Sequence, residues 1–128
     1  MRGWLGLSIL MPSFEFFCPF PSRNLSPNAR LHWAVLAKAK KKAKAETFWL
    51  AKEAGLGKIE ADEIRVSLTF YPPTRARYDD DGLISRCKAH LDAISEVVGV
   101  DDRHFRINAI QRGPVEKHGM LKIKLEWD

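Results

Sequence analysis

Two segments with alternating apolar and polar residues constrain the fold of this chain most strongly. They are "EIRVSLTFY" at residues 63–71 and "MLKIKLEW" at residues 120–127. Side chains of an extended strand point alternately to its two faces, so a strand that is buried on one face shows this period of two. "SFEFFCPF" at residues 13–20 and "HFRINAI" at residues 104–110 are also expected to be strands. The chain should therefore contain a sheet with one buried face.

Two segments between these strands have the period of a helix. The first helix should run from about Leu31 to Ala54, with Asn28 as a candidate N-cap. The second should run from near Gly82 to Gly99, and either Asp80 or Asp81 is its candidate cap. The apolar stripes, at three- and four-residue spacing, are Leu36, Ala39, Ala43, Thr47, Leu50 and Ala54 in the first helix and Ile84, Cys87, Leu91, Ile94 and Val98 in the second.

The predicted order of elements is β-α-β-α-β-β. This order places the chain in the α/β class, of the α+β type, with a mixed sheet and two main helices. With 128 residues, the chain is expected to form a single domain. We assign residues 13–128 to that domain and expect residues 1–12 to be an N-terminal extension, with Met11 as an alternative start.

Positive charge is concentrated in the first half of the chain. Residues 1–58 carry ten basic and three acidic side chains, a net charge of +7, whereas residues 59–128 carry eleven and thirteen, a net charge of −2. Five lysines lie within "KAKKKAK" without an intervening acid, which favours a surface that faces phosphate groups over an ordinary solvated helix face. These lysines are Lys38, Lys40, Lys41, Lys42 and Lys44.

Five aspartates flank the second predicted helix. Asp79 and Asp81 are two residues apart, so their side chains can converge on an extended segment while Asp80 points elsewhere. Asp101 and Asp102 follow the far end of the helix. A helix of this length spans roughly 25 Å, so the two groups do not meet through the helix itself. They meet only if the chain turns back or if a second subunit closes the gap.

Lys88 lies seven residues after Asp81, on the same side of that helix. Helical side chains lean toward the N-terminus, so its ammonium can reach toward the acids and a bound phosphate. Taken alone, Lys88 is explained as a surface lysine, and the three adjacent aspartates as a cap with solvated charges. Together with the second aspartate pair they indicate a Mg²⁺ site, because Mg²⁺ prefers one or two carboxylates, several waters and phosphate oxygens.

Other patterns argue against several further classes of protein. The four histidines lack a zinc-binding spacing, and His104 is better explained as a structural or solvent-exposed residue than as a proton-transfer group. No glycine-rich phosphate loop supports a nucleotide cofactor. Cys18 and Cys87 form no paired motif, which is typical of a reducing, cytoplasmic compartment. No apolar run approaches the length of a membrane span.

Three motifs, "RYDDDGL", "KAHLDAI" and "GVDDRHF", resemble the RusA family of Holliday-junction resolvases. "PFPSRNLSPNARLHW" resembles the N-terminal segment of that family, and the similarity covers roughly residues 13–127. The resemblance implies a homodimeric endonuclease that uses Mg²⁺, for which Mn²⁺ can substitute, to cut four-way DNA junctions in recombination and repair. The expected location is the cytoplasm of a bacterial or phage-infected cell. Residue by residue, the resemblance implies catalytic roles for Asp79, Asp81, Lys88 and Asp102. The three aspartates among them are the implied metal ligands.

The match leaves its register open at two points. Asp80 can replace one of the first pair, and Asp101 can replace Asp102, which we favour because the resemblance aligns the second residue of that pair. Gly82 stands where the family usually has Asn, which keeps a non-catalytic DNA-binding module as an alternative, beside a Mg²⁺ nuclease acting on other branched DNA. The candidate DNA-contacting residues are Arg23, Asn28, Arg30, Lys38, Lys40, Lys41, Lys42, Lys44, Arg75 and Arg77.

Overall fold

Four strands form a single mixed sheet. The computed structural model describes residues 12–27, 29–30 and 32–128. The strands lie in the spatial order β1-β4-β2-β3, in which β4 is antiparallel to both of its neighbours and β3 is parallel to β2. Their bounds are Ser13–Cys18 for β1, Ile64–Tyr71 for β2, Phe105–Arg112 for β3 and Met120–Glu126 for β4. The predicted mixed α and β architecture is confirmed.

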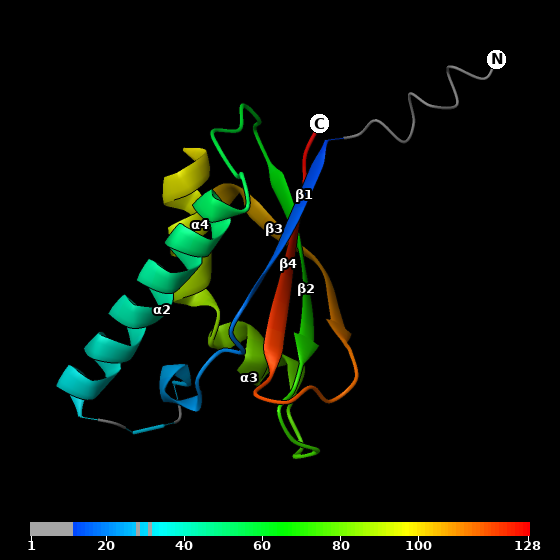
Figure 1. Ribbon diagram of the computed structural model, residues 1–128. Helices are drawn as coiled ribbons and strands as arrows, with labels where there is room; N and C mark the ends of the chain where they lie inside the picture. The colour runs from blue at the N-terminus through cyan, green and yellow to red at the C-terminus, as the bar shows by residue number, and fades with distance from the viewer. Residues whose placement is uncertain (1–11, 28, 31) are drawn as a thin grey trace.

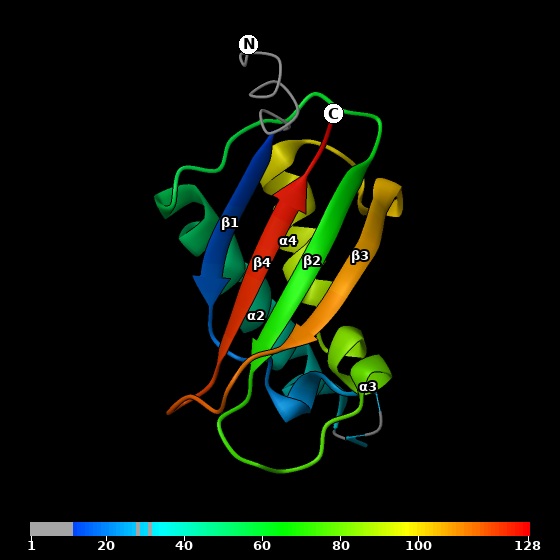
Figure 2. The same cartoon turned by 90° about the vertical axis from the view of Figure 1, so that its right-hand side faces the viewer.

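The two longer helices, α2 (Trp33–Glu53) and α4 (Lys88–Val98), lie together on one face of the sheet (Figure 1). Figure 2 shows the sheet from its other face, with both helices behind it. The described residues also form three shorter elements: the helix α3 (Asp80–Ser85) and the 3₁₀ turns η1 (Arg23–Leu25) and η2 (Asp102–His104). No helix in the described part of the chain combines the length and apolarity needed to cross a bilayer.

The core lies between the sheet and these helices. Leu121, Ile123 and Leu125 of β4 are fully buried, whereas the intervening residues of that strand are half-buried. Ile94 and Val98 of α4 pack into the same apolar cluster. The alternation in the sequence therefore marks the face of the sheet that the helices cover, and this arrangement stabilises the fold mainly by burial of apolar surface.

The second helix is broken, and the prediction of one continuous helix from Gly82 to Gly99 is wrong. α3 ends at Ser85, and α4 begins at Lys88. Arg86 lies in the break, where its guanidinium donates to the carbonyl of Pro21 at 3.3 Å and lies 5.8 Å from the ring of Tyr78. We attribute the break to these tertiary contacts, because the sequence contains no proline or glycine at this point.

The predicted helix caps also differ from the observed ones. Asp79, and not Asp80 or Asp81, caps α3. His32 caps α2 through its Nδ1, which accepts from the backbone N–H of Ala34 at 3.2 Å. Asn28 lies outside the described residues, as do Leu31 and residues 1–11 with Met11. In the first apolar stripe the predicted Ala54 is exposed, and Ala51 is buried in its place.

Candidate functional site

Asp79 closes the N-terminal end of α3 with its side chain. Its Oδ1 accepts hydrogen bonds from the backbone N–H groups of Asp81 and Gly82, at 3.0 and 3.4 Å. Because the first N–H groups of a helix have no partner within the helix, this carboxylate satisfies two of them. A Cβ at Gly82 would lie 3.3 Å from the second carboxylate oxygen of Asp79, so a side chain here would require that carboxylate to move by a few tenths of an ångström.

A basic residue that was not among the predicted site residues binds the middle aspartate of the triplet. Arg112, at the end of β3, lies 2.8 Å from Oδ1 of Asp80 and also donates to the carbonyl oxygen of Tyr78. Arg112 thereby ties the acidic segment to the edge strand of the sheet. All three aspartates are exposed, but the carboxylate of Asp81 forms no hydrogen bond or ion pair within the described residues. The three adjacent aspartates therefore have three different environments.

Lys88 and Asp102 meet, although α4 lies between them in the sequence. Nζ of Lys88 lies 2.7 Å from Oδ2 of Asp102 and 3.1 Å from Oδ1 of Asp92. The side chain of Lys88 is 67% exposed, whereas that of Asp102 is 24% exposed. A single ammonium thus holds two carboxylates beside the first turn of α4, in a site that solvent can enter.

The chain reaches this arrangement by turning back after α4. Gly99 caps the helix in the left-handed conformation, with φ of 79°. The hydroxyl of Ser95 then donates to the carbonyl of Val100 at 2.7 Å, and Oδ1 of Asp101 caps the next turn by accepting from the N–H of Arg103 at 3.0 Å. This turn brings the second aspartate of the pair, Asp102, to face Lys88, but it does not bring it into one group with Asp79 and Asp81 within the described residues.

The described residues do not bring all the predicted metal ligands together. Among them, no group of three or more His, Cys, Asp or Glu side chains lies close enough to hold a metal ion. Asp79 and Asp81 are at the start of α3, whereas Asp102 lies with Lys88 beside α4. His104 is exposed, and its Nε2 accepts from Nε of Arg103 at 3.4 Å. Two charged residues of this region, Asp92 and Arg112, were not among the predicted site residues.

Basic side chains line a groove beside Lys88. A cavity of about 350 Å³ lies between the start of α2 and the break between α3 and α4, and its basic lining residues are Lys40, Arg86 and Lys88. Lys44, by contrast, forms an ion pair with Glu96 of α4. The other predicted DNA contacts in the described chain are exposed: Arg23, Arg30, Lys38, Lys41, Lys42, Arg75 and Arg77.

The two buried cysteines and the acidic site have different electrostatic properties. Burial raises the pKa of both Cys18 and Cys87 to about 12, so both remain neutral thiols rather than reactive thiolates at neutral pH. In the acidic site, the hydrogen bond from Lys88, followed by the contact with Asp92, holds the pKa of Asp102 below its usual value. The hydrogen bonds that Lys88 donates to Asp102 and to Asp92 raise the pKa of Lys88 itself.

Replacing Lys88 with Met is therefore expected to raise the pKa of the Asp102 carboxyl group. Because the folded-state pKa of Asp102 is depressed, this pair stabilises the fold above the unfolded pKa of Asp102, and the stabilisation is lost as the pH falls through the folded pKa. Carbon-13 NMR titration of the aspartate carboxyls, without metal, measures the shift, with Lys117→Met as the control. An Asp102 pKa that is the same in wild type and Lys88→Met would contradict the observed pairing.

The chain is similar in sequence to a protein from a bacterium. The chain is 38% identical over 110 residues to an uncharacterized protein of Xylella fastidiosa, and the match spans 84% of this chain and 72% of the relative. No model of a known protein family matches the chain. The similarity covers most of both proteins, so it extends over the domain rather than over a short motif.

Proposed function

We propose that this chain, which belongs to the same protein family as the Xylella fastidiosa protein, is a Mg²⁺-dependent endonuclease that resolves four-way DNA junctions by paired cuts. The observation that carries the proposal is the contact of Lys88 with Asp102, which joins two of the four residues for which the RusA resemblance implies catalytic roles. The basic groove beside Lys88 supports a phosphate-bearing substrate.

The donor atoms of the acidic site suit Mg²⁺. They are carboxylate oxygens, and Mg²⁺ is bound through one or two carboxylates, with water and substrate phosphate completing its shell. Binding of Mg²⁺ therefore does not require three protein carboxylates in one group, and the described residues contain no such group. We assign Asp79, Asp81 and Asp102 to the metal, or to water molecules bound to it. Bound Mg²⁺, or Mn²⁺ in its place, would supply activation of water and stabilisation of charge on the scissile phosphate.

The surroundings of each aspartate support the proposed register. The charge of Asp80 is compensated by Arg112, and Asp101, unlike Asp102, forms no ion pair with Lys88 within the described residues. Asp81 is exposed, and Asp102 faces the ammonium of Lys88. Asp79 keeps one carboxylate oxygen that makes neither of the two capping bonds. In this proposal Lys88, positioned by Asp102 and Asp92, binds the phosphate or the leaving group.

Paired cuts require two sites, and one chain carries a single acidic set. We therefore propose a homodimer, in which two sites related by a two-fold axis face the two continuous strands of a junction with matching pseudo-symmetry. The α2 lysines would hold the DNA arms, and their exposure on the helix supports this role.

Two alternatives are separated from this proposal by substrate choice. A nuclease for other branched DNA would cut a flap or a fork faster than a four-way junction, and a non-catalytic DNA-binding module would bind all of them and cut none. Parallel binding and cleavage assays on these three substrates, with Mg²⁺ and with EDTA, therefore decide among the three functions. Preferential cleavage of the four-way junction supports the proposal.

Replacing Lys38, Lys41 and Lys42 together with Ala is expected to weaken junction binding and to flatten its salt dependence. Each lost phosphate contact should reduce the slope of log K against log salt by about 0.9. Fluorescence anisotropy between low and moderate salt measures the slope. Lys52→Ala is the control on the same helix, because Lys52 is exposed but is not among the predicted DNA contacts. An unchanged slope in the triple variant would mean that these lysines only face solvent.

A further inference from the structure

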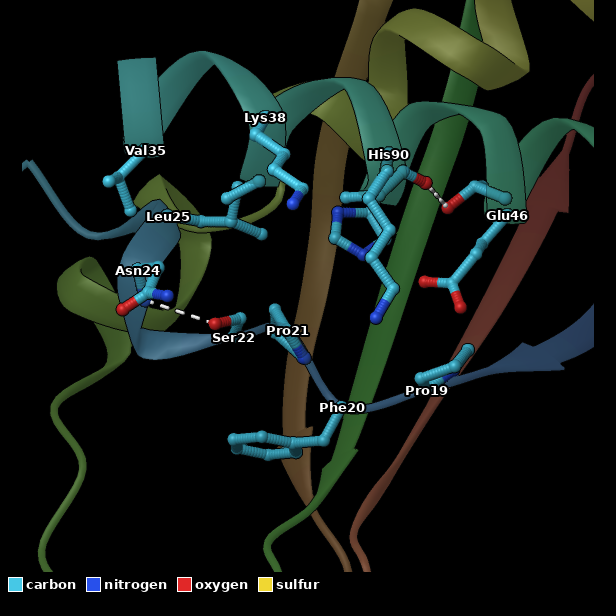
Figure 3. A pocket seen from close by; sticks show the side chains of 14 residues that line it. Pro19, Phe20, Pro21, Ser22, Asn24, Leu25, Val35, Lys38, Glu46 and His90 are labelled. Carbon is cyan, nitrogen blue, oxygen red and sulfur yellow. Dashed lines mark hydrogen bonds between the residues drawn. The ribbon is translucent and has the colours of Figure 1, made fainter. Parts of the chain in front are cut away.

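A second cavity, of about 360 Å³, lies between α2 and the segment that leads from β1 into η1 (Figure 3). It is distinct from the groove beside Lys88, whose basic residues it does not share. Pro19, Phe20 and Pro21 form one side, and Ala39, Ala43 and Thr47 of α2 form another. Its volume is at the lower end of the range of sites that bind small organic groups, and such sites are mainly apolar with a few polar atoms.

One buried polar atom of the cavity lining, a ring nitrogen of His90, is unpaired. His90 of α4 lines the cavity and is only 3% exposed, yet its Nδ1 has no hydrogen-bond partner in the described chain. Burial lowers the pKa of His90 to about 4, so its imidazole is neutral at pH 7. Leaving a buried polar atom unpaired costs stability, and a ring of similar shape without nitrogen, such as Phe, would remove that cost. A ligand that hydrogen-bonds to Nδ1 would remove this cost.

Two lysines of α2 also line this cavity. Lys38 and Lys42 are one helical turn apart on that helix. No ion pair joins either of them to a carboxylate within the described residues. The hydroxyl of Thr47 already donates to the carbonyl of Ala43 at 2.8 Å, so it is not a free donor for a ligand. The cavity thus offers an apolar wall, a neutral imidazole and two ammonium groups, with the carboxylate of Glu46 as a further lining group, so its lysines outnumber its acids by one.

These properties fit a ligand with a flat, weakly polar part and an anionic part. A phosphate ion alone would leave the interior and His90 unused, and a purely apolar group would leave both ammoniums and Nδ1 without partners. We infer that the cavity receives one unpaired nucleotide of bound DNA, with its base against His90 and its phosphate at Lys38 and Lys42. The inference rests on the proposed function only in taking DNA as the partner. Extruded bases are held in the same manner, by hydrogen bonds to an edge and by apolar or aromatic walls.

The test compares two labelled duplexes that carry a one-nucleotide bulge, one with adenine at the bulge and one with an abasic site there. Fluorescence anisotropy of the full chain in EDTA, where no cleavage occurs, gives both dissociation constants. The wild-type protein is expected to bind the adenine bulge on the order of tenfold more tightly than the abasic bulge, which is the size of effect that one stacked base contributes. His90→Phe removes the polar atom, and Ala39→Leu fills the cavity. Both should bring the ratio close to one.

The control is Ala45→Leu, which makes the same change at an exposed position of α2 that does not line the cavity. It should keep the wild-type ratio. Equal binding of the two duplexes by wild type, or a wild-type ratio in either folded variant, would overturn the inference. If one variant fails to fold, the other decides. Competition by deoxyadenosine monophosphate without discrimination between the duplexes would also overturn it, by assigning the cavity to free nucleotides.

This test and the proposed function fail separately. A protein that discriminates the bulges in EDTA but cuts no DNA with Mg²⁺ loses the proposed function and keeps the nucleotide site. A protein that cuts junctions but binds both bulges equally loses only the nucleotide site.

Discussion

Replacing Asp81 with Asn is expected to abolish Mg²⁺-dependent cleavage of a four-way junction while leaving junction binding intact or stronger. Asn keeps the size of the side chain but removes the charge of an exposed carboxylate assigned to the metal. Metal-ion catalysis supplies several kcal/mol of transition-state stabilisation, so its loss should slow cleavage by at least ~10³-fold. Binding depends on basic residues, which a nearby carboxylate opposes, so the two quantities should change separately. A gel assay on a labelled junction, with Mg²⁺ and with EDTA, measures both.

Asp80→Asn is the matched control for this experiment. It makes the same chemical change one residue away, at a side chain that pairs with Arg112. Substantial cleavage should remain, because an exposed ion pair of this kind contributes only ~0–1 kcal/mol to stability. Asp79→Asn and Asp102→Asn should behave like Asp81→Asn. Full activity in Asp81→Asn, or an inactive Asp80→Asn beside an active Asp79→Asn, would show that the assigned register is wrong.

Replacing Lys88 with Met is expected to reduce cleavage by about 10²–10³-fold, as the loss of one positioned charge at a reacting group does. Met keeps the length and the apolar stem of the side chain and removes the ammonium. Junction affinity should fall much less, because several other exposed basic residues contribute to it. Single-turnover cleavage at saturating protein separates the chemical step from binding.

Asp92→Asn tests whether Asp92 only positions Lys88. It removes one of the two carboxylates on the ammonium and leaves Asp102 in place, at 2.7 Å. The expected loss of cleavage is smaller than in Lys88→Met, and the pH–rate profile should shift because one acid no longer supports the ammonium. Wild-type rates for Lys88→Met would remove Lys88 from the chemistry and leave it a structural ion-pair partner.

The strands were predictable from sequence because their burial is one-sided. Leu121, Ile123 and Leu125 face the helices, and the polar residues between them face away, so the period of two is visible directly. β3 was harder to delimit. It lies at the edge of the sheet beside β2, with a register shift between Val66 and Ser67, and its residues are mostly exposed. The predicted strand accordingly stopped at residue 110, whereas the observed strand continues to Arg112.

The break between α3 and α4 could not be predicted, because its cause is not local. Arg86 is held there by the carbonyl of Pro21 and the ring of Tyr78, which lie in other parts of the chain. The cap was missed for a related reason. Each of three adjacent aspartates is an acceptable cap by residue type, and only the backbone path shows that the first one takes the role.

The candidate site was predictable in its residue types but not in its contacts: Lys88 was expected to reach toward Asp81, whereas it pairs with Asp102 and Asp92. Asp102 reaches Lys88 because Gly99 permits the left-handed turn that sends the chain back along α4. Asp92 had a visible signal, its position four residues after Lys88, where helical side chains of opposite charge meet. Arg112 had none, because it approaches Asp80 only through the parallel pairing of β2 and β3.

The most direct test of the proposed function is to map the cuts in a synthetic four-way junction whose four strands are labelled in turn. With Mg²⁺, the wild-type protein should cut two opposite strands at symmetry-related positions, and EDTA should abolish both cuts. A linear duplex of the same sequence should remain intact. Binding of the junction without any Mg²⁺-dependent cut, or equal cutting of the linear duplex, would contradict the assignment of this chain as a junction-resolving endonuclease.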